Sequence, residues 1–234
     1  MKLYLIRHGQ SSNNLLWAET QNWVGRSPDP LLTELGELQA VQLATHFASG
    51  SLPQPTVLFS SLMIRAIQTA APLATALDLP IQGHLELNEV RGPFTGAKTE
   101  ALTHPGSPAS KLLAVTERLV LPEKATEDGW YDRGFETPAG AVARAEQAIR
   151  GILDSYVETD ETVAIVCHEW FAQYLLRSAM GMQTSQDQEI PWFTFNNTCH
   201  AMVDYASTKS GDPLPPEIRW TNRSDHLRED QRTS

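Results

Sequence analysis

Short apolar runs alternate with longer amphipathic segments along most of the chain. Runs rich in apolar and β-branched residues predict strands at residues 2–6, 56–59, 84–87, 162–166, 199–205 and 216–221. Apolar residues three or four positions apart predict helices at residues 33–48, 63–77, 137–156 and 170–180. Such alternation indicates an α/β fold, a three-layer α/β/α sandwich with a mostly parallel central sheet.

Two of the predicted helices have recognisable starts. Thr33 and Thr137 are suitable N-caps, because a threonine hydroxyl accepts a hydrogen bond from a free N–H of the first turn. Pro138 follows Thr137 and suits the first helical position. The residues expected on one apolar face of the first of these helices are Leu35, Leu38, Val41 and Ala44.

The region 93–135 interrupts the regular alternation, with four prolines and short helical pieces such as 110–120. We interpret it as an insertion over one end of the sheet that faces the substrate. Residues 1–224 are expected to form a single domain. The last ten residues, 225–234, are polar and are expected to form a frayed tail.

Composition and charge narrow the functional classes. The chain has 234 residues and a formal net charge of −10, which argues against the broad basic surface that nucleic acid or anionic membranes require. We see neither an apolar stretch of the roughly 20 residues that span a bilayer nor a signal peptide. Two cysteines do not make a disulfide framework, so a cytoplasmic location is expected. The oligomeric state is left open.

Residues that carry chemistry follow three of the predicted strands. Arg7-His8-Gly9 comes directly after the first strand, Arg65 opens the helix after the second, and His168 follows the strand at 162–166. Ligands of open α/β sheets bind outside the carboxyl ends of the strands. We therefore expect these two arginines and two histidines to surround one site.

This set of side chains suits a phosphoryl group. Arginines stabilise the charge on its equatorial oxygens, and a histidine nitrogen can attack phosphorus to give a phosphohistidine. The leaving alkoxide needs a proton from a nearby carboxylic acid, for which Glu89 and Glu169 are candidates. No group of residues has metal-ligand spacing, and no cofactor is expected.

The segment Arg7-His8-Gly9-Gln10-Ser11 with Asn14 resembles the signature of the histidine phosphatase superfamily, which includes the phosphoglycerate mutases. Further similar segments follow in the family's order at residues 30–36 (PLLTELG), 60–70 (SSLMIRAIQTA), 87–89 (LNE), 136–138 (ETP) with Arg144, and 166–168 (VCH). The resemblance covers most of residues 1–205. It implies a phosphoglycerate mutase-like fold.

The resemblance also implies a role for each matching residue. His8 would be the phosphorylated nucleophile, with Glu89 as general acid and then base. Arg7, Arg65 and His168 would bind the transferring phosphate, and Asn14 would line the pocket. Glu169 departs from the glycine usual in the mutase-type branch. Because the acid phosphatase branch has its proton donor at this position, Glu169 is a rival acid.

Three functions remain open after these steps. The first is a phosphomonoester hydrolase that acts on a small phosphorylated metabolite through phosphohistidine. The second is a mutase, which needs additional cations for a second anionic group; the candidates are Arg91, Lys98, Arg118 and Arg133. The third is a noncatalytic protein that binds a phosphorylated ligand on the same fold. Because basic residues are sparse across 93–135, we favour the hydrolase, with specificity expected from this insertion and from Trp23 and Arg26.

Overall fold

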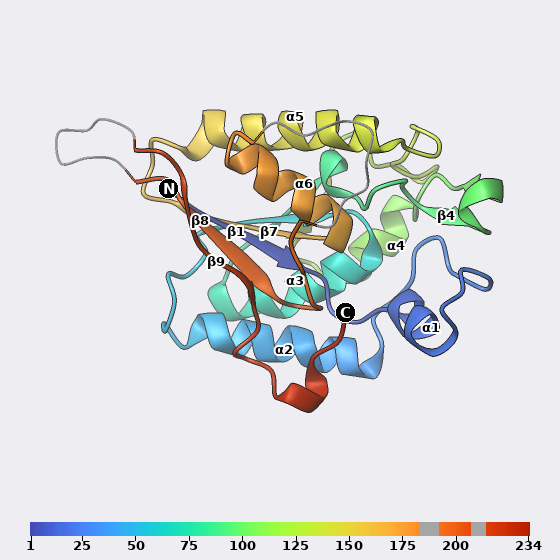
Figure 1. Ribbon diagram of the computed structural model, residues 1–234, viewed down its shortest axis with the longest axis horizontal. Helices are drawn as coiled ribbons and strands as arrows, with labels where there is room; N and C mark the ends of the chain where they lie inside the picture. Colours follow the sequence, from blue (N-terminus) through green and yellow to red (C-terminus); the bar gives the residue numbers. More distant parts are fainter. Residues whose placement is uncertain (183–191, 207–213) are drawn as a thin grey trace.

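The computed structural model describes residues 1–182, 192–206 and 214–234. Within them, a seven-stranded sheet forms the centre of the molecule (Figure 1). Its strands are β1 (Lys2–Arg7), β2 (Val57–Ser61), β3 (Ile81–His84), β6 (Leu119–Val120), β7 (Thr162–Cys167), β8 (His200–Asp204) and β9 (Glu217–Arg223). They lie in the order β6-β3-β2-β7-β1-β8-β9. Neighbours from β6 to β1 are parallel, and β8 and β9 add antiparallel strands at the other edge.

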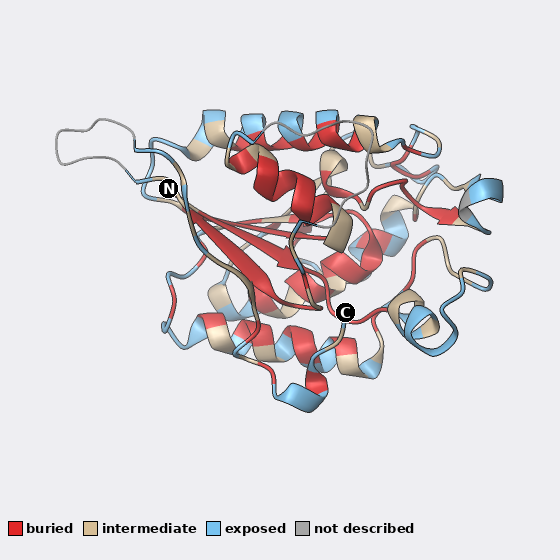
Figure 2. Cartoon of the chain, viewed as in Figure 1, coloured by how far each residue is buried: buried red, intermediate tan, exposed pale blue. Residues whose placement is uncertain are grey.

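Helices cover both faces of this sheet, which confirms the predicted three-layer sandwich (Figure 1). Helices α2 (Glu34–Ala48) and α3 (Ile64–Leu77) lie on one face, and α5 (Pro138–Tyr156) and α6 (Glu169–Ala179) on the other. Side chains of β1 alternate between the layers. Leu3 and Leu5 pack into the core with α5 and α6, whereas Tyr4 and Ile6 pack with α2 and α3. The central strands are therefore buried on both sides, as Figure 2 shows.

The predicted helix starts at Thr33 and Thr137 are confirmed. The Thr33 hydroxyl accepts a hydrogen bond from the Gly36 N–H at 3.1 Å, and the Thr137 hydroxyl accepts one from Gly140 at 3.2 Å. Pro138 is the first residue of α5. Side-chain oxygens at these positions satisfy N–H groups that have no partner inside the helix.

The buried face of α2 includes Ala44, as predicted, but differs from the predicted face at other positions. Leu38 and Val41 are 44% and 52% exposed. Leu43 and Phe47 are buried instead, and Phe47 packs edge-on against Tyr4 with the ring centroids 5.0 Å apart. Apolar residues occupy both sides of this helix, so their spacing alone did not show which side faces the sheet. The side that carries the large Phe47 ring packs against it.

The third strand lies earlier than we predicted. Residues 81–84 form β3, whereas most of the predicted strand 84–87 is the 3₁₀ turn η1 (Leu85–Leu87). The His84 side chain caps this turn, because its Nδ1 accepts a hydrogen bond from the Glu86 N–H at 3.1 Å. The alternating residues Leu85-Glu86-Leu87 fit one tight turn as well as a strand.

The region 93–135 contributes to the central sheet as well as to a separate small one. It contains β4 (Phe94–Thr95), η2 (Lys98–Glu100), β5 (Leu102–Thr103) and α4 (Ala109–Leu113) before β6. The predicted helical piece 110–120 is wrong beyond residue 113, because residues 119–120 pair with β3 as the edge strand β6. Such a two-residue strand has too few positions to show a period.

The C-terminal residues are packed rather than frayed. They include the short turn η3 (Glu229–Gln231), and Gln231 is buried. Gln39 of α2 donates a hydrogen bond to the Gln231 carbonyl at 2.7 Å, and the Thr233 hydroxyl donates to Asn197 Oδ1 at 2.9 Å. These tertiary contacts hold a segment whose polar composition predicted mobility. None of the helices in the described parts of the chain is long and apolar enough to cross a membrane.

Candidate active site

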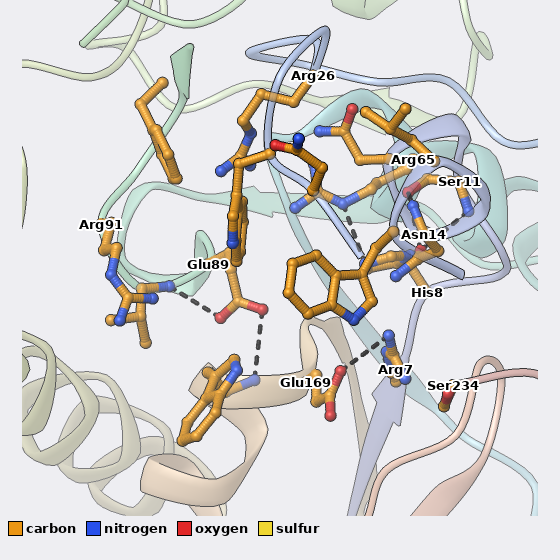
Figure 3. A pocket seen from close by; sticks show the side chains of 18 residues that line it. Arg7, His8, Ser11, Asn14, Arg26, Arg65, Glu89, Arg91, Glu169 and Ser234 are labelled. Carbon is orange, nitrogen blue, oxygen red and sulfur yellow. Dashed lines mark hydrogen bonds and ion pairs between the residues drawn. The ribbon is translucent and has the colours of Figure 1, made fainter. Parts of the chain in front are cut away.

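A cavity of about 440 Å³ opens at the carboxyl ends of β1 and β7 and is rich in charged side chains (Figure 3). The charged or titratable residues that line it are Arg7, His8, Arg26, Arg65, Glu89, Arg91 and Glu169. They come from segments far apart in the sequence, which the parallel sheet brings to one end. The cavity therefore has the position that the strand-end pattern predicted.

His8 has its tautomer set by two hydrogen bonds. Its Nδ1 lies 2.7 Å from the Gly9 carbonyl oxygen, and the Arg65 Nε–H donates to its Nε2 at 3.0 Å. Because Nε2 accepts, the proton lies on Nδ1. Burial, together with the positive charges of Arg65 and Arg7, lowers the pKa of His8 well below its ordinary value. The ring is therefore neutral at pH 7, with an unprotonated Nε2.

Gly9 permits a close backbone approach beside His8. A Cβ added to Gly9 would lie 2.5 Å from the Gly36 carbonyl oxygen, and one added to Gly36 would lie 2.0 Å from the Gln10 carbonyl oxygen. Only glycine leaves room for this contact. The backbone after β1 thus packs directly against the start of α2. This contact fixes the backbone position of His8.

Arg65 lies in the first turn of α3, and Asp29 holds that turn. The N-cap residue Met63 has no side-chain oxygen, but the Asp29 carboxylate accepts a hydrogen bond from the Ile64 N–H at 2.9 Å. Asp29 also accepts one from the Ser107 hydroxyl at 2.7 Å. Sequence analysis missed Asp29, because a carboxylate that caps a helix 35 residues away leaves no local signal.

His168 lies directly beside His8, with the ring centroids 5.1 Å apart. It is fully buried, and its Nε2 is 2.8 Å from the Ser61 hydroxyl, whereas its Nδ1 has no partner among the described residues. Burial and then Arg65 lower its pKa well below the ordinary value. The structure therefore brings the two imidazoles together, with His168 behind His8 and outside the set that lines the cavity.

Arg7 and Glu169 form an ion pair at the edge of the cavity. The Arg7 Nη2 lies 2.9 Å from Glu169 Oε2, and Arg7 Nη1 donates to the Phe195 carbonyl. The Arg7 side chain is 2% exposed, whereas that of Glu169 is 37% exposed. Glu169 thus neutralises and orients a buried cation.

Glu89 lies at the N-terminus of α6 (Figure 3). One carboxylate oxygen accepts from the N–H groups of Val90 and Phe171 at 2.8 and 3.0 Å, and the other from Trp170 at 3.3 Å. Burial nevertheless raises the pKa of Glu89 above its ordinary value, even though these N–H groups and Arg65 oppose the shift. Glu89 therefore holds a proton to higher pH than an exposed carboxyl does.

Asn14 lines the cavity from α1 (Ser12–Thr20), a helix that sequence analysis missed. Its amide oxygen accepts hydrogen bonds from the N–H and the hydroxyl of Ser11 at 3.0 and 2.8 Å, which completes a capping box. No residue of α1 is buried, so the helix has no apolar period to detect. The sequence signal that this helix did offer was the spacing of Ser11 and Asn14, which is that of a capping box.

The remaining cations divide between the cavity and the outer surface. Arg26 and Arg91 line the cavity together with Trp23, as we expected for Trp23 and Arg26. Arg118 pairs with Asp78 and Arg133 with Glu86, both outside the cavity. The Lys98 side chain lies outside the described part of the chain. Among the described residues, no three His, Cys, Asp or Glu side chains are grouped as a metal site.

A protein-family model matches most of the chain. The model of the histidine phosphatase superfamily, branch 1, matches residues 3–210. The chain belongs to that superfamily. No curated protein sequence matches the chain.

Solved structures show the same fold at low sequence identity. The mycobacterial glucosyl-3-phosphoglycerate phosphatase is 19% identical, with a TM-score of 0.63 over 95% of this chain and 99% of that one. A phosphoserine phosphatase from Entamoeba histolytica, solved with 3-phosphoglyceric acid, is 21% identical, with a TM-score of 0.60 over 97% and 98%. A putative alpha-ribazole-5'-P phosphatase from Escherichia coli is 22% identical, with a TM-score of 0.61 over 96% and 98%. This superfamily member thus shares its whole fold with proteins described as phosphatases.

Proposed function

We propose that this superfamily member is a phosphomonoester hydrolase that acts on a small phosphorylated metabolite through a covalent phosphohistidine on His8. The observation that carries the proposal is the unprotonated Nε2 of His8 beside two arginines in the cavity. Superfamily membership supports the same chemistry. The three similar structures described above also carry names of phosphatases for small phosphorylated compounds.

In the first step, His8 Nε2 attacks phosphorus while the bond from phosphorus to the substrate alcohol breaks. Protonated Glu89 gives its proton to the departing oxygen. Arg7 and Arg65 stabilise the negative charge on the phosphoryl oxygens, and His168 joins them once its ring, which does not line the cavity of the free protein, reaches these oxygens. Arg65 donates to Nε2 in the free protein, so its guanidinium must turn toward these oxygens before the lone pair can attack.

In the second step, water attacks the phosphohistidine and the N–P bond breaks. Glu89, now a carboxylate, accepts a proton from the water, which restores its acid form and releases inorganic phosphate. Neutral His8 is regenerated with its proton on Nδ1. No external cofactor enters this scheme.

A mutase is the second candidate, because Arg26 and Arg91 line the cavity in addition to the arginines assigned to the transferring phosphate. A mutase returns the phosphoryl group to its product, whereas a hydrolase passes it to water. Isomer formation from 3-phosphoglycerate, measured against phosphate release, separates the two. We favour the hydrolase on the three similar structures.

The remaining assignments concern domain, partners and location. We propose one domain over residues 1–224, against which the segment 225–234 packs. Phe94 of the region 93–135 lines the cavity. The partner is a small phosphorylated substrate rather than nucleic acid or a membrane, in keeping with the charge of −10. Cys167 and Cys199 are free thiols, in keeping with a cytoplasmic location.

The test of the hydrolase compares His8→Ala with the wild-type chain. Wild type is expected to hydrolyse p-nitrophenyl phosphate and to yield a labelled, alkali-stable phosphohistidine from a ³²P-phosphate ester. His8→Ala should lose both the turnover and the label. His104→Ala is the matched control, since His104 bonds Thr95 outside the cavity. Turnover that persists in His8→Ala would identify another nucleophile.

A further inference from the structure

Arg26 reaches the cavity from the loop between α1 and α2 and is held there by aromatic rings (Figure 3). Its guanidinium carbon lies 3.5 Å from the centroid of the Phe94 ring and 4.9 Å from that of Trp23. Stacking over a ring uses the flat face of a guanidinium and leaves its N–H donors along the edge. Arg26 is thus positioned as a donor toward a ligand.

Arg26 has no ion-pair partner within the described part of the chain, although the Glu89 carboxylate attracts its charge. Its Nε and Nη1 are buried without a hydrogen-bond partner, and it has no ion pair there. Arg7, by contrast, pairs with Glu169, and Arg65 donates to His8. Burial, with the charges of Arg65 and Arg91, lowers the pKa of Arg26 to about 9, so the group is still a cation at neutral pH. A buried cation with free donors is costly until an anion binds it.

The roles of the other arginines point the same way. Arg7 and Arg65 are assigned to the transferring phosphate, and Glu169 is paired with Arg7. Arg26 lines the cavity without such a role, and its Nε and Nη1 have no hydrogen-bond partner among the described residues. An ester of a neutral alcohol would leave the charge of this side chain unpaired.

We infer, on the basis of the proposed function, that the substrate carries a second anionic group, a carboxylate or a second phosphate, which Arg26 binds. Arg26 is then a residue that determines specificity. The preferred substrates are phosphate esters of acidic alcohols, rather than esters of neutral alcohols such as simple polyols. The sparse cations of region 93–135 did not predict this, because the deciding cation comes from the loop between α1 and α2 and packs against Phe94 of that region.

The test measures binding to the His8→Ala chain, which holds substrates without turnover. 3-Phosphoglycerate and glycerol 3-phosphate differ only by a carboxylate in place of a hydroxymethyl group, so the ratio of their dissociation constants reports the second anion. Calorimetry should show tighter binding of 3-phosphoglycerate, and Arg26→Met should reduce the ratio by about tenfold to a hundredfold. Arg26→Lys should retain part of the preference. Arg150→Met, on the exposed side of α5, is the matched control and should leave the ratio unchanged.

Propane-1,3-diol bisphosphate, compared with the corresponding monophosphate, forms the second arm. The second anionic group is identified as phosphate if Arg26 favours the bisphosphate over the monophosphate but does not favour 3-phosphoglycerate over glycerol 3-phosphate. The inference is overturned if Arg26→Met leaves both ratios unchanged, or if it weakens charged and neutral esters equally. The proposed function fails separately, if the chain with His8 intact hydrolyses neither p-nitrophenyl phosphate nor any of these esters.

Discussion

At the residue scale, the two carboxylates of the cavity have different surroundings. Glu89 is half-buried, accepts hydrogen bonds from backbone N–H groups among the described residues, and has a raised pKa. Glu169 is partly exposed and paired with Arg7. A general acid must hold a proton near the working pH, whereas the partner of a buried arginine must stay ionised. This contrast supports the proposal that Glu89 is the acid and that Glu169 orients Arg7.

The leaving group tests this assignment. Glu89→Gln should slow hydrolysis of an alkyl phosphate by about 10²- to 10⁴-fold, and that of p-nitrophenyl phosphate far less, because nitrophenolate departs without a proton. Glu169→Gln should slow both substrates by similar factors, since it acts through Arg7. Steady-state kcat on the two substrates makes the comparison. The reverse pattern would make Glu169 the acid.

At the element scale, helix α5 holds the loop that carries Glu89. Arg144 forms a double hydrogen bond to the Glu136 carboxylate at 2.6 and 2.8 Å, and its Nη1 donates to the carbonyls of Glu86 and Asn88. Both side chains of the ion pair are 5% exposed or less. A helix on one face of the sheet thus fixes the position of a carboxyl group at the sheet's end.

Removal of Arg144 should therefore affect both stability and catalysis. Arg144→Met leaves the Glu136 carboxylate buried without its partner and should lower the free energy of unfolding by about 3–5 kcal/mol. Turnover of an alkyl phosphate should fall as well, because the loop of Glu89 loses two hydrogen bonds. Urea unfolding measures the first effect. Arg150→Met is the control on the same helix and should unfold within about 0.5 kcal/mol of wild type. An equal loss of stability in Arg150→Met would contradict the role given to Arg144.

At the scale of the whole molecule, three histidines join α2, β8 and the C-terminal segment. The rings of His46, His200 and His226 lie 5.7 to 6.3 Å apart. Burial, reinforced by the neighbouring histidines, lowers the pKa of His200 to about 3 and that of His226 to about 4. These residues are far apart in the sequence, so their individual positions did not suggest a cluster.

This cluster should make the fold sensitive to acid. The unfolded chain binds a proton at each histidine near pH 6.5, whereas folded His200 stays neutral until far lower pH, so stability is lost as pH falls below 6.5. His200 alone should contribute roughly 2 kcal/mol of this loss between pH 6.5 and 5. Urea unfolding at both pH values is expected to show a smaller acid loss in His200→Gln, whose side-chain oxygen can still accept from Trp220. Equal losses in both chains would contradict the prediction.

How much of the fold could be predicted depends on whether the sequence signal for each element lies within that element. Thr33 and Thr137 cap their own helices, and the buried strands at 2–6 and 162–166 form continuous apolar runs, so both kinds of element were read correctly. Helix α1 has no apolar face, and β6 has two residues, so neither had a period to detect. The buried side of α2 depended on packing against Tyr4, which lies outside the helix itself.

The sequence by itself determined the α/β order, the superfamily resemblance and the placement of Arg7, His8, Arg65 and His168 after strands or at a helix start. That was possible because parallel strands bring their carboxyl ends to one edge whatever the loops do. Only the tertiary structure decided the cap that Asp29 supplies to α3, the hydrogen bonds of Glu89 at the start of α6 and the unpaired donors of Arg26. Each depends on which distant groups surround a side chain, since burial and neighbouring charge set its hydrogen bonds and its pKa.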